Sequence, residues 1–227
     1  MSSQRKTASL GSSKFGRRGF LKASAAASAV LALGLDSAGN VVRGQGAPPQ
    51  NVGPKVFGTW LTFGPDNTVT FYSPEVEYGQ GTNTALAILI AEELDMDWSK
   101  LRVVQSGSEE VYGSPLSHHV ATNSSAAIRF RFDQMRKIGA SARELLKAAA
   151  AAQWSVPVAE LTTEKSMVVH AASKRSATYG SLSAAAAKLP MPGENITLRP
   201  PSQWKIIGTS VPRLDIELKC TGRAKYN

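Results

Sequence analysis

The stretch that decides the fold is residues 77–94, EYGQGTNTALAILIAEEL. Gly79 and Gly81 bracket Gln80, and apolar residues spaced three and four apart follow them. That spacing predicts a helix over Thr82–Leu94 with a broad buried face. Glycine permits the positive backbone angles of a tight turn and lets a ligand approach the main chain. The stretch therefore predicts a glycine-rich loop that leads into a buried helix.

Strands and helices alternate on both sides of this stretch. The predicted strands are 56–63 and 68–72, joined by the turn sequence Gly-Pro-Asp-Asn, then 101–105, 160–163 and 167–170. The other predicted helices are a long one over about 125–153 and a short alanine-rich one over 181–189. This order predicts an α+β fold, a small mixed sheet with packed helices, with one domain over about 55–190.

Charged residues gather on both helices. The long helix carries five basic residues largely off its apolar stripe: Arg129, Arg131, Arg136, Lys137 and Arg143. Such a pattern is typical of a solvated face. Carboxylates occur in adjacent pairs, Glu92-Glu93 and Glu109-Glu110. Neighbours on a helix diverge by about 100°, so such a pair cannot share one substrate atom, and solvent exposure is the better interpretation.

Composition and motifs exclude several classes of protein. The 227 residues are 42% hydrophobic and 19% charged, which is typical of a globular chain. The single cysteine, Cys220, excludes a disulfide framework, a Cys-rich zinc site and a cluster held by four thiolates. No nucleophile elbow or phosphate loop occurs. His118-His119 could ligate a metal, but no third ligand has a motif-like spacing, so we expect no metal site in this chain.

The net charge of +9 does not indicate a nucleic-acid partner. Residues 1–46 carry seven cations against Asp36 alone, so most of the basic character lies in this first segment. It contains RRGFLK, residues 17–22, followed by an apolar run over 23–35. This pattern resembles the twin-arginine export signal, and the matching residues are Arg17, Arg18, Phe20, Leu21 and Lys22.

The resemblance to an export signal implies a periplasmic protein that is exported already folded, with membrane association only through partners. The apolar run of 13 residues is shorter than the roughly 20 that a spanning helix needs. A short amphiphilic N-terminal helix is the alternative. We divide the chain into a signal and linker over 1–46, a ligand-contacting domain segment over 47–192, and a connector over 193–227 that has little of its own to bury and should be mobile.

Two helix starts have the chemistry of a binding site. The loop at Gly79, Gln80 and Gly81 offers an amide and leads to helix N–H groups, which attract anions. The long helix is preceded by Thr122, Asn123, Ser124 and Ser125, which are small polar residues. A glycine-rich bend and ordinary helix caps are the plain alternatives. If the two starts converge, an elongated polyanionic ligand such as a nucleotide-bearing cofactor fits them best.

These residues together resemble a known family. The sequence EYGQG, the following TALAILIAEELD and DWSKLRV closely resemble the molybdenum-binding large subunit of the xanthine oxidase superfamily. The most similar branch contains the isoquinoline 1-oxidoreductase beta chain and bacterial aldehyde dehydrogenases. The segments VPRLD, 211–215, and KCTGRAKY, 219–226, resemble the start of that family's next module, the α/β hammerhead.

The resemblance implies a molybdopterin-binding domain segment and assigns residues within it. Gly79, Gln80 and Gly81 match the motif that hydrogen-bonds the pterin, and the loop Thr122, Asn123, Ser124 and Ser125 matches a second contact. Tyr78 replaces the usual methionine. The implied cofactor is molybdopterin in its cytosine dinucleotide form, with two-iron two-sulfur clusters on a partner subunit.

The same resemblance implies what else the enzyme needs. The implied partners are the remainder of the large subunit, the two-iron two-sulfur small subunit and a cytochrome c. The family's Gly-Gly-Phe-Gly segment and its catalytic glutamate have no counterpart in these 227 residues. We therefore expect a split gene, a truncated reading frame or a fragment without turnover of its own. An exported binding or scaffold domain that reuses the fold without cofactor is the alternative.

Overall fold

The computed structural model describes residues 31–35, 40–43, 60–108, 110–114, 119–193 and 195–224. Five strands form a mixed sheet in the order β2-β1-β3-β4-β5: β1 (Ala32–Leu35), β2 (Val41–Arg43), β3 (Leu61–Phe63), β4 (Val69–Ser73) and β5 (Leu101–Gln105). Three more form an antiparallel sheet in the order β6-β7-β8: β6 (Leu161–Glu164), β7 (Met167–His170) and β8 (Arg175–Thr178). The mixed α and β fold with a small mixed sheet agrees with the sequence prediction.

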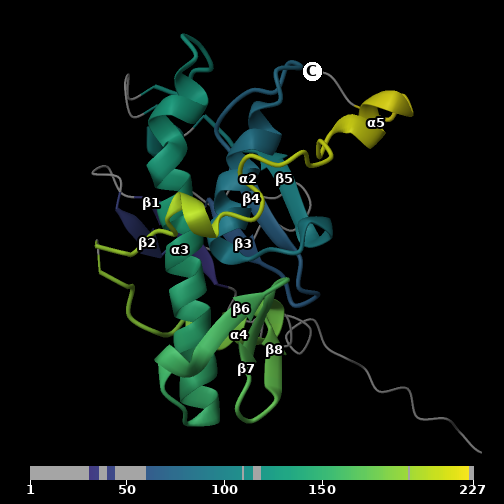
Figure 1. The fold of residues 1–227 in the computed structure, drawn as a ribbon. Coiled ribbons are helices and arrows are strands. Elements are labelled where there is room, and N and C mark those ends of the chain that lie inside the picture. Colours follow the sequence, from purple (N-terminus) through teal and green to yellow (C-terminus); the bar gives the residue numbers. More distant parts are fainter. Residues whose placement is uncertain are drawn as a thin grey trace, which may run out of the picture.

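The helices in the described part of the chain are α2 (Thr82–Leu94), α3 (Ala126–Trp154), α4 (Tyr179–Ala186) and α5 (Ile216–Cys220). Of these four helices, three pack against the strands, and α5 lies apart from both sheets (Figure 1). Short 3-10 turns lie at Trp98–Lys100, Glu110–Tyr112, Val158–Glu160 and Pro201–Gln203. Among the described residues, no helix combines the length and the apolar character that crossing a membrane requires.

The unit that positions the site is β4-α2-β5. β4 and β5 pair in parallel, with Phe71 opposite Val103, and α2 is the crossover between them. The bounds of α2 agree with the prediction from periodicity. This arrangement puts the glycine-rich loop directly after the carboxyl end of β4, where ligands bind in many α/β units.

α2 packs closely against α3. Gly139 of α3 lies against the backbone of α2, and a Cβ at this position would come within 2.6 Å of the Ile90 carbonyl oxygen. Leu86, Ile90, Met135 and Ile138 are fully buried in the shared core. The close approach of the two backbones brings the polar side chains of both helices into one buried layer.

The predicted boundary at residue 46 does not separate two structural units. β1 and β2 precede it, yet β1 pairs with both β2 and β3 inside the five-stranded sheet. Leu31 and Leu33 are fully buried. The end of the apolar run therefore belongs to the core of the sheet, because a short apolar run has the same composition in a buried strand as in an export signal. Residues 1–30, including Arg17 and Arg18, lie outside the described residues.

The prediction of exposed charges on α2 and α3 is wrong for most of them, namely Glu92, Glu93, Arg131, Arg136 and Arg143. Glu93 is fully buried and its carboxylate accepts from Arg136 Nη2 at 2.6 Å and Arg143 Nη1 at 3.0 Å. Arg131 is also buried. Arg129 and Lys137 are exposed as predicted, while Glu109 and the Glu110 side chain lie outside the described residues. Charges can lie inside this layer because they are paired and hydrogen-bonded.

The connector after residue 193 is also more firmly held than we predicted. The buried Glu92 carboxylate accepts three successive backbone N–H groups, from Lys205, Ile206 and Ile207, at 2.7 to 3.0 Å. Arg199 donates its backbone N–H to Glu93 at 3.1 Å. The expectation of a mobile tail is wrong for residues 199–207, because buried carboxylates on α2 bind their main chain.

Candidate functional site

The glycine-rich loop is closed by its own glutamate. Gly79 and Gly81 have positive φ angles of 117° and 85°, which favour glycine. The Glu77 carboxylate accepts the N–H groups of Gly79 at 2.9 Å, Gly81 at 2.9 Å and Asn83 at 3.2 Å. The N–H groups of Gly81 and Asn83 at the start of α2, where the sequence suggested an anion site, are thus bound by a carboxylate from within the loop.

Glu77 is held in its charged form by these contacts. Partial burial raises the pKa of this carboxyl group. The N–H groups of Gly81, Gly79 and Asn83 donate to it and lower its pKa by more, so the net shift is downward. Arg213 adds a cation, with its Nη2 at 3.3 Å from Glu77 Oε1. The charged Glu77 therefore belongs to the structure of the loop itself.

Gln80 braces the same loop. Its Nε2 donates to the Val76 carbonyl oxygen at 2.7 Å, and its Oε1 accepts from the Tyr78 N–H at 2.9 Å. Gln80 is exposed, and the Tyr78 side chain is 68% exposed. A primary amide has two donor hydrogens and two acceptor lone pairs, so Gln80 keeps capacity for a ligand after both loop contacts.

The two predicted loops lie in contact. Thr122 Oγ1 accepts from the Val76 N–H at 2.8 Å, and the Tyr78 hydroxyl donates to the Thr122 carbonyl oxygen at 3.4 Å. The loops that precede α2 and α3 therefore meet at Thr122, which is the condition for a shared ligand site. Folding alone achieves this convergence, since more than forty positions separate Val76 from Thr122 in the chain.

The start of α3 is open. Asn123, Ser124 and Ser125 are exposed, and no side chain caps the helix at Ser125. Ser124 and Ser125 both have positive φ angles, 52° and 54°, and Ala126 donates its N–H to the Asn123 carbonyl oxygen at 2.9 Å. Because no side chain caps this helix start, its remaining N–H groups favour an anion.

A buried ion pair that we did not predict lies beneath both loops. Arg131 Nε and Glu75 Oε1 are 2.7 Å apart, and both side chains are at most 2% exposed. Thr122 Oγ1 donates to Glu75 Oε2 at 2.7 Å. The sequence shows Glu75 and Arg131 as ordinary charged residues, and no local signal marks them, since only the packing of α3 brings them together.

Arg213 was also not predicted at this site. The sequence placed it in the segment resembling a separate module, but its Nη1 donates to the Gly79 carbonyl oxygen at 2.9 Å. Asp215 accepts from Arg213 Nε at 2.9 Å, and this contact is the largest of those that lower the Asp215 pKa. The neighbouring Leu214 N–H donates to Thr84 Oγ1 at 3.2 Å. The segment around Arg213 therefore fastens the glycine-rich loop from outside.

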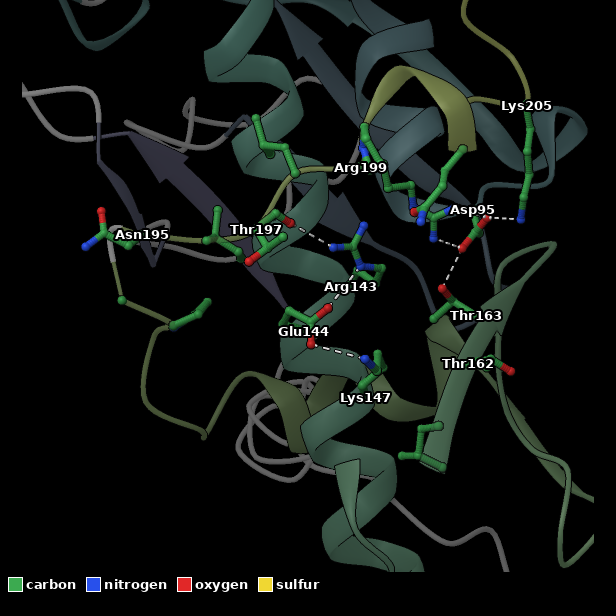
Figure 2. Close-up of a pocket in the computed structure, with 17 residues that line it drawn as sticks. Asp95, Arg143, Glu144, Lys147, Thr162, Thr163, Asn195, Thr197, Arg199 and Lys205 are labelled. Atoms are coloured by element: carbon green, nitrogen blue, oxygen red, sulfur yellow. Dashed lines mark hydrogen bonds and ion pairs between the residues drawn. The ribbon is translucent and has the colours of Figure 1, made fainter. Parts of the chain in front are cut away.

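A large cavity lies at the other end of α2 (Figure 2). It has a volume of about 1080 Å³ and lies between α3, β6 and residues 192–205. Figure 2 shows its charges facing one another: Asp95 accepts from Lys205 Nζ at 2.8 Å, and Glu144 from Lys147 Nζ at 3.3 Å. None of the residues predicted to bind the cofactor lines it.

The histidines of the described residues do not form a metal centre. His170 lies 2.9 Å from Glu160 and 2.7 Å from Ser173, and no group of three potential ligands occurs in the described part of the chain. His118 lies outside the described residues, and His119 accepts the Ser114 N–H through its carbonyl oxygen.

The two loops have the chemistry of a site for a polar, elongated ligand. A Cβ built on Gly79 would meet no atom within 4 Å, so the main chain is open to a ligand there. The uncapped start of α3 lies next to it through Thr122. Main-chain donors, an amide and hydroxyl groups are the contacts that a pterin and its phosphate require.

Comparison with known proteins gives the family. Residues 22–214 match the molybdopterin cofactor-binding domain family, and the chain belongs to that family. It is 36% identical over 251 residues to the beta chain of isoquinoline 1-oxidoreductase from Brevundimonas diminuta, a match that covers 94% of this chain and 31% of that protein.

Two further relatives are oxidoreductases by name. A membrane-bound aldehyde dehydrogenase (pyrroloquinoline-quinone) of Gluconacetobacter polyoxogenes is 27% identical over 92% of this chain and 27% of its own length. A nicotinate dehydrogenase subunit of Pseudomonas putida is 27% identical over 71% of this chain and 13% of its own length. The chain thus spans at most about a third of the length of these relatives.

Proposed function

We propose that this chain is the N-terminal, cofactor-contacting part of a molybdenum hydroxylase. The observation that carries the proposal is the contact between the two loops at Thr122, in a chain that belongs to the molybdopterin-binding family. Gly79, Gln80 and Gly81 would hold the pterin from one side, and the loop from Thr122 to Ser125 would hold it from the other.

The residues of this chain bind and orient the cofactor. The bound molybdenum cofactor supplies the redox chemistry. Glu77 and Arg213 hold the glycine-rich loop in the shape that leaves Gly79 open. The exposed start of α3 offers N–H groups to the cofactor's phosphate, consistent with its cytosine dinucleotide form. No catalytic residue is assigned to this chain, and the catalytic glutamate belongs to the part of the enzyme that it does not contain.

The names of the relatives support the reaction class. Isoquinoline and nicotinate are N-heterocycles, and the third relative is named for aldehydes. We propose that the complete enzyme oxidises one of these two substrate classes. Its partners would be the remainder of the large subunit, a small subunit with two-iron two-sulfur clusters and a cytochrome c.

Molybdenum content tests this function. We would purify the chain with the products of its neighbouring genes and measure molybdenum by mass spectrometry for wild type, Gln80→Ala and Gln80→Glu. The alanine variant should retain the cofactor about ten- to one-hundredfold less tightly, corresponding to about 1–3 kcal/mol for unpaired polar groups. The glutamate variant should be worse, since it loses the donor and repels phosphate.

The matched control is the exposed Gln153 at the end of α3, changed in the same two ways. These variants should hold as much molybdenum as wild type. If both Gln80 variants also retain molybdenum fully, Gln80 does not contact the cofactor. If the wild-type assembly holds none, the alternative of an exported scaffold domain without cofactor is favoured.

We further propose export to the periplasm by the twin-arginine route. Replacing Arg17 and Arg18 by lysine should leave the protein in the cytoplasm, and periplasmic delivery of that variant would exclude this route. Because Leu31 and β1 are buried in the sheet, we expect the exported chain to retain residues 31–35. Mass spectrometry of the exported chain would contradict this expectation if the chain began after β1.

A further inference from the structure

The contacts beneath the two loops form one continuous series. Arg131 Nη2 donates to the Tyr112 carbonyl oxygen at 2.9 Å, and Arg131 Nε donates to Glu75 Oε1 at 2.7 Å. Glu75 Oε2 accepts from Thr122 Oγ1 at 2.7 Å. Thr122 Oγ1 in turn accepts from the Val76 N–H at 2.8 Å, within the loop that carries Gln80.

The direction of each hydrogen bond follows from the one before it. The carboxylate of Glu75, paired with Arg131, can only accept. The single hydrogen of the Thr122 hydroxyl must therefore point to Glu75. The lone pairs of that hydroxyl are then left for the N–H of Val76. A buried charge thus sets the orientation of a hydroxyl group, and the hydroxyl holds the main chain of the opposite loop.

Arg131 is buried, and its side-chain hydrogen bonds all belong to this series of contacts. It is 1% exposed, its guanidinium lies over the Trp60 ring at 5.4 Å, and its Nη1 has no hydrogen-bond partner. A buried arginine with an unpaired N–H is unfavourable for stability alone. Its contacts instead bring α3, the loop before α3 and the loop before α2 into fixed positions.

We infer that Arg131 and Glu75 are positioning residues, which act through Thr122 to hold the two cofactor-contacting loops at the spacing that the cofactor requires. This inference rests on the proposed function, but its central claim concerns the chain without cofactor. The Thr122 hydroxyl, and not the bulk of its side chain, should couple the two loops.

Hydrogen exchange of the full chain without cofactor tests the coupling directly. In Thr122→Val the shape is kept and the hydroxyl is lost, so amide exchange of residues 76–81 should become at least about tenfold faster. Thr122→Ser keeps the hydroxyl and should exchange within about twofold of wild type. The exposed Thr162, changed to valine, is the matched control and should leave residues 76–81 unchanged.

The ion pair is tested with Glu75→Gln, both as a single variant and combined with Thr122→Val. This variant should loosen residues 76–81 as Thr122→Val does, and the double variant should be no looser than either single one. If Glu75→Gln loses its near-UV circular dichroism, the threonine variants alone decide the question. Exchange in Thr122→Val equal to wild type, or exchange in Thr122→Ser equal to Thr122→Val, would overturn the inference.

Molybdenum retention in the assembled enzyme separates the two proposals. Faster exchange together with faster molybdenum loss in Thr122→Val supports the positioning role. Molybdenum loss with unchanged exchange means that Thr122 acts only by direct contact, and the inference is then wrong. A wild-type assembly without molybdenum contradicts the proposed function, while the exchange result still decides whether the hydroxyl couples the loops.

Discussion

Glu93 on α2 is the residue whose change should destabilise the chain most clearly. Its carboxylate is fully buried and accepts from Arg136 Nε at 3.0 Å, Arg136 Nη2 at 2.6 Å and Arg143 Nη1 at 3.0 Å. The Arg199 backbone N–H also donates to it, at 3.1 Å. Glu93 therefore pairs with two buried guanidinium groups and holds the connector, while Arg143 also pairs with Glu144 at 3.0 Å.

Glu93→Gln keeps the size of the side chain and removes its charge. The amide keeps one acceptor oxygen and directs an NH₂ group toward a guanidinium of Arg136 or Arg143. Leaving buried charges without their partner costs about 3–5 kcal/mol. Because a domain has only about 5–15 kcal/mol of stability, this is a large fraction. With a urea m-value of about 2 kcal/mol/M, the unfolding midpoint should fall by about 1.5–2.5 M.

The assay is equilibrium unfolding in urea, followed by circular dichroism. Glu164→Gln on β6 is the matched control, since that side chain is exposed and the chemical change is the same. Its midpoint should shift by no more than about 0.3 M, corresponding to about 0.5 kcal/mol. Limited proteolysis should also cut residues 195–207 faster in Glu93→Gln than in wild type. Equal midpoints for the two variants would refute the reasoning that paired burial makes Glu93 essential.

Two further predictions concern pH and packing. Burial raises the pKa values of Glu77 and Asp95, but hydrogen bonds, and for Asp95 also the Arg199 cation, outweigh this effect, so both pKa values are lowered. The stabilisation by these two carboxylates is therefore present above their unfolded-state pKa values of about 4 and is lost as the pH falls through their lower folded-state pKa values. The free energy of unfolding should decline below about pH 4 and stay nearly level between pH 5 and 7. A free energy of unfolding that rises on acidification would contradict this prediction. Gly139→Ala should destabilise the chain by about 1–2 kcal/mol. Its Cβ would meet the Ile90 carbonyl oxygen at 2.6 Å, so the overpacking cost should be about 2–3 kcal/mol, while the better helix propensity of alanine stabilises by about 1 kcal/mol. Gly193→Ala, whose Cβ would meet nothing within 4 Å, should unfold like wild type in urea, and equal stability of both alanine variants would exclude a tight contact between the helices.

Local sequence patterns determined much of the β4-α2-β5 unit. The apolar spacing after Gly81 predicted α2 with its observed bounds, since helix periodicity depends on neighbours within four residues. Gly79 and Gly81 have the positive φ angles that a glycine-rich turn suggested. β8 was missed because its sequence, Arg-Ser-Ala-Thr, has no apolar alternation. The sheet position of β1 was missed because it depends on β3, which is distant in sequence.

The sequence by itself also determined which residues could form the two loops, and the resemblance in these residues led to the family. Only the tertiary structure decided that Thr122 lies against Val76 and that Arg213 returns to Gly79. It also decided that Glu75, Glu93 and their arginines are buried. The physical reason is that periodicity reports which face of a helix is apolar, whereas the burial of a charge depends on a partner that another part of the chain supplies.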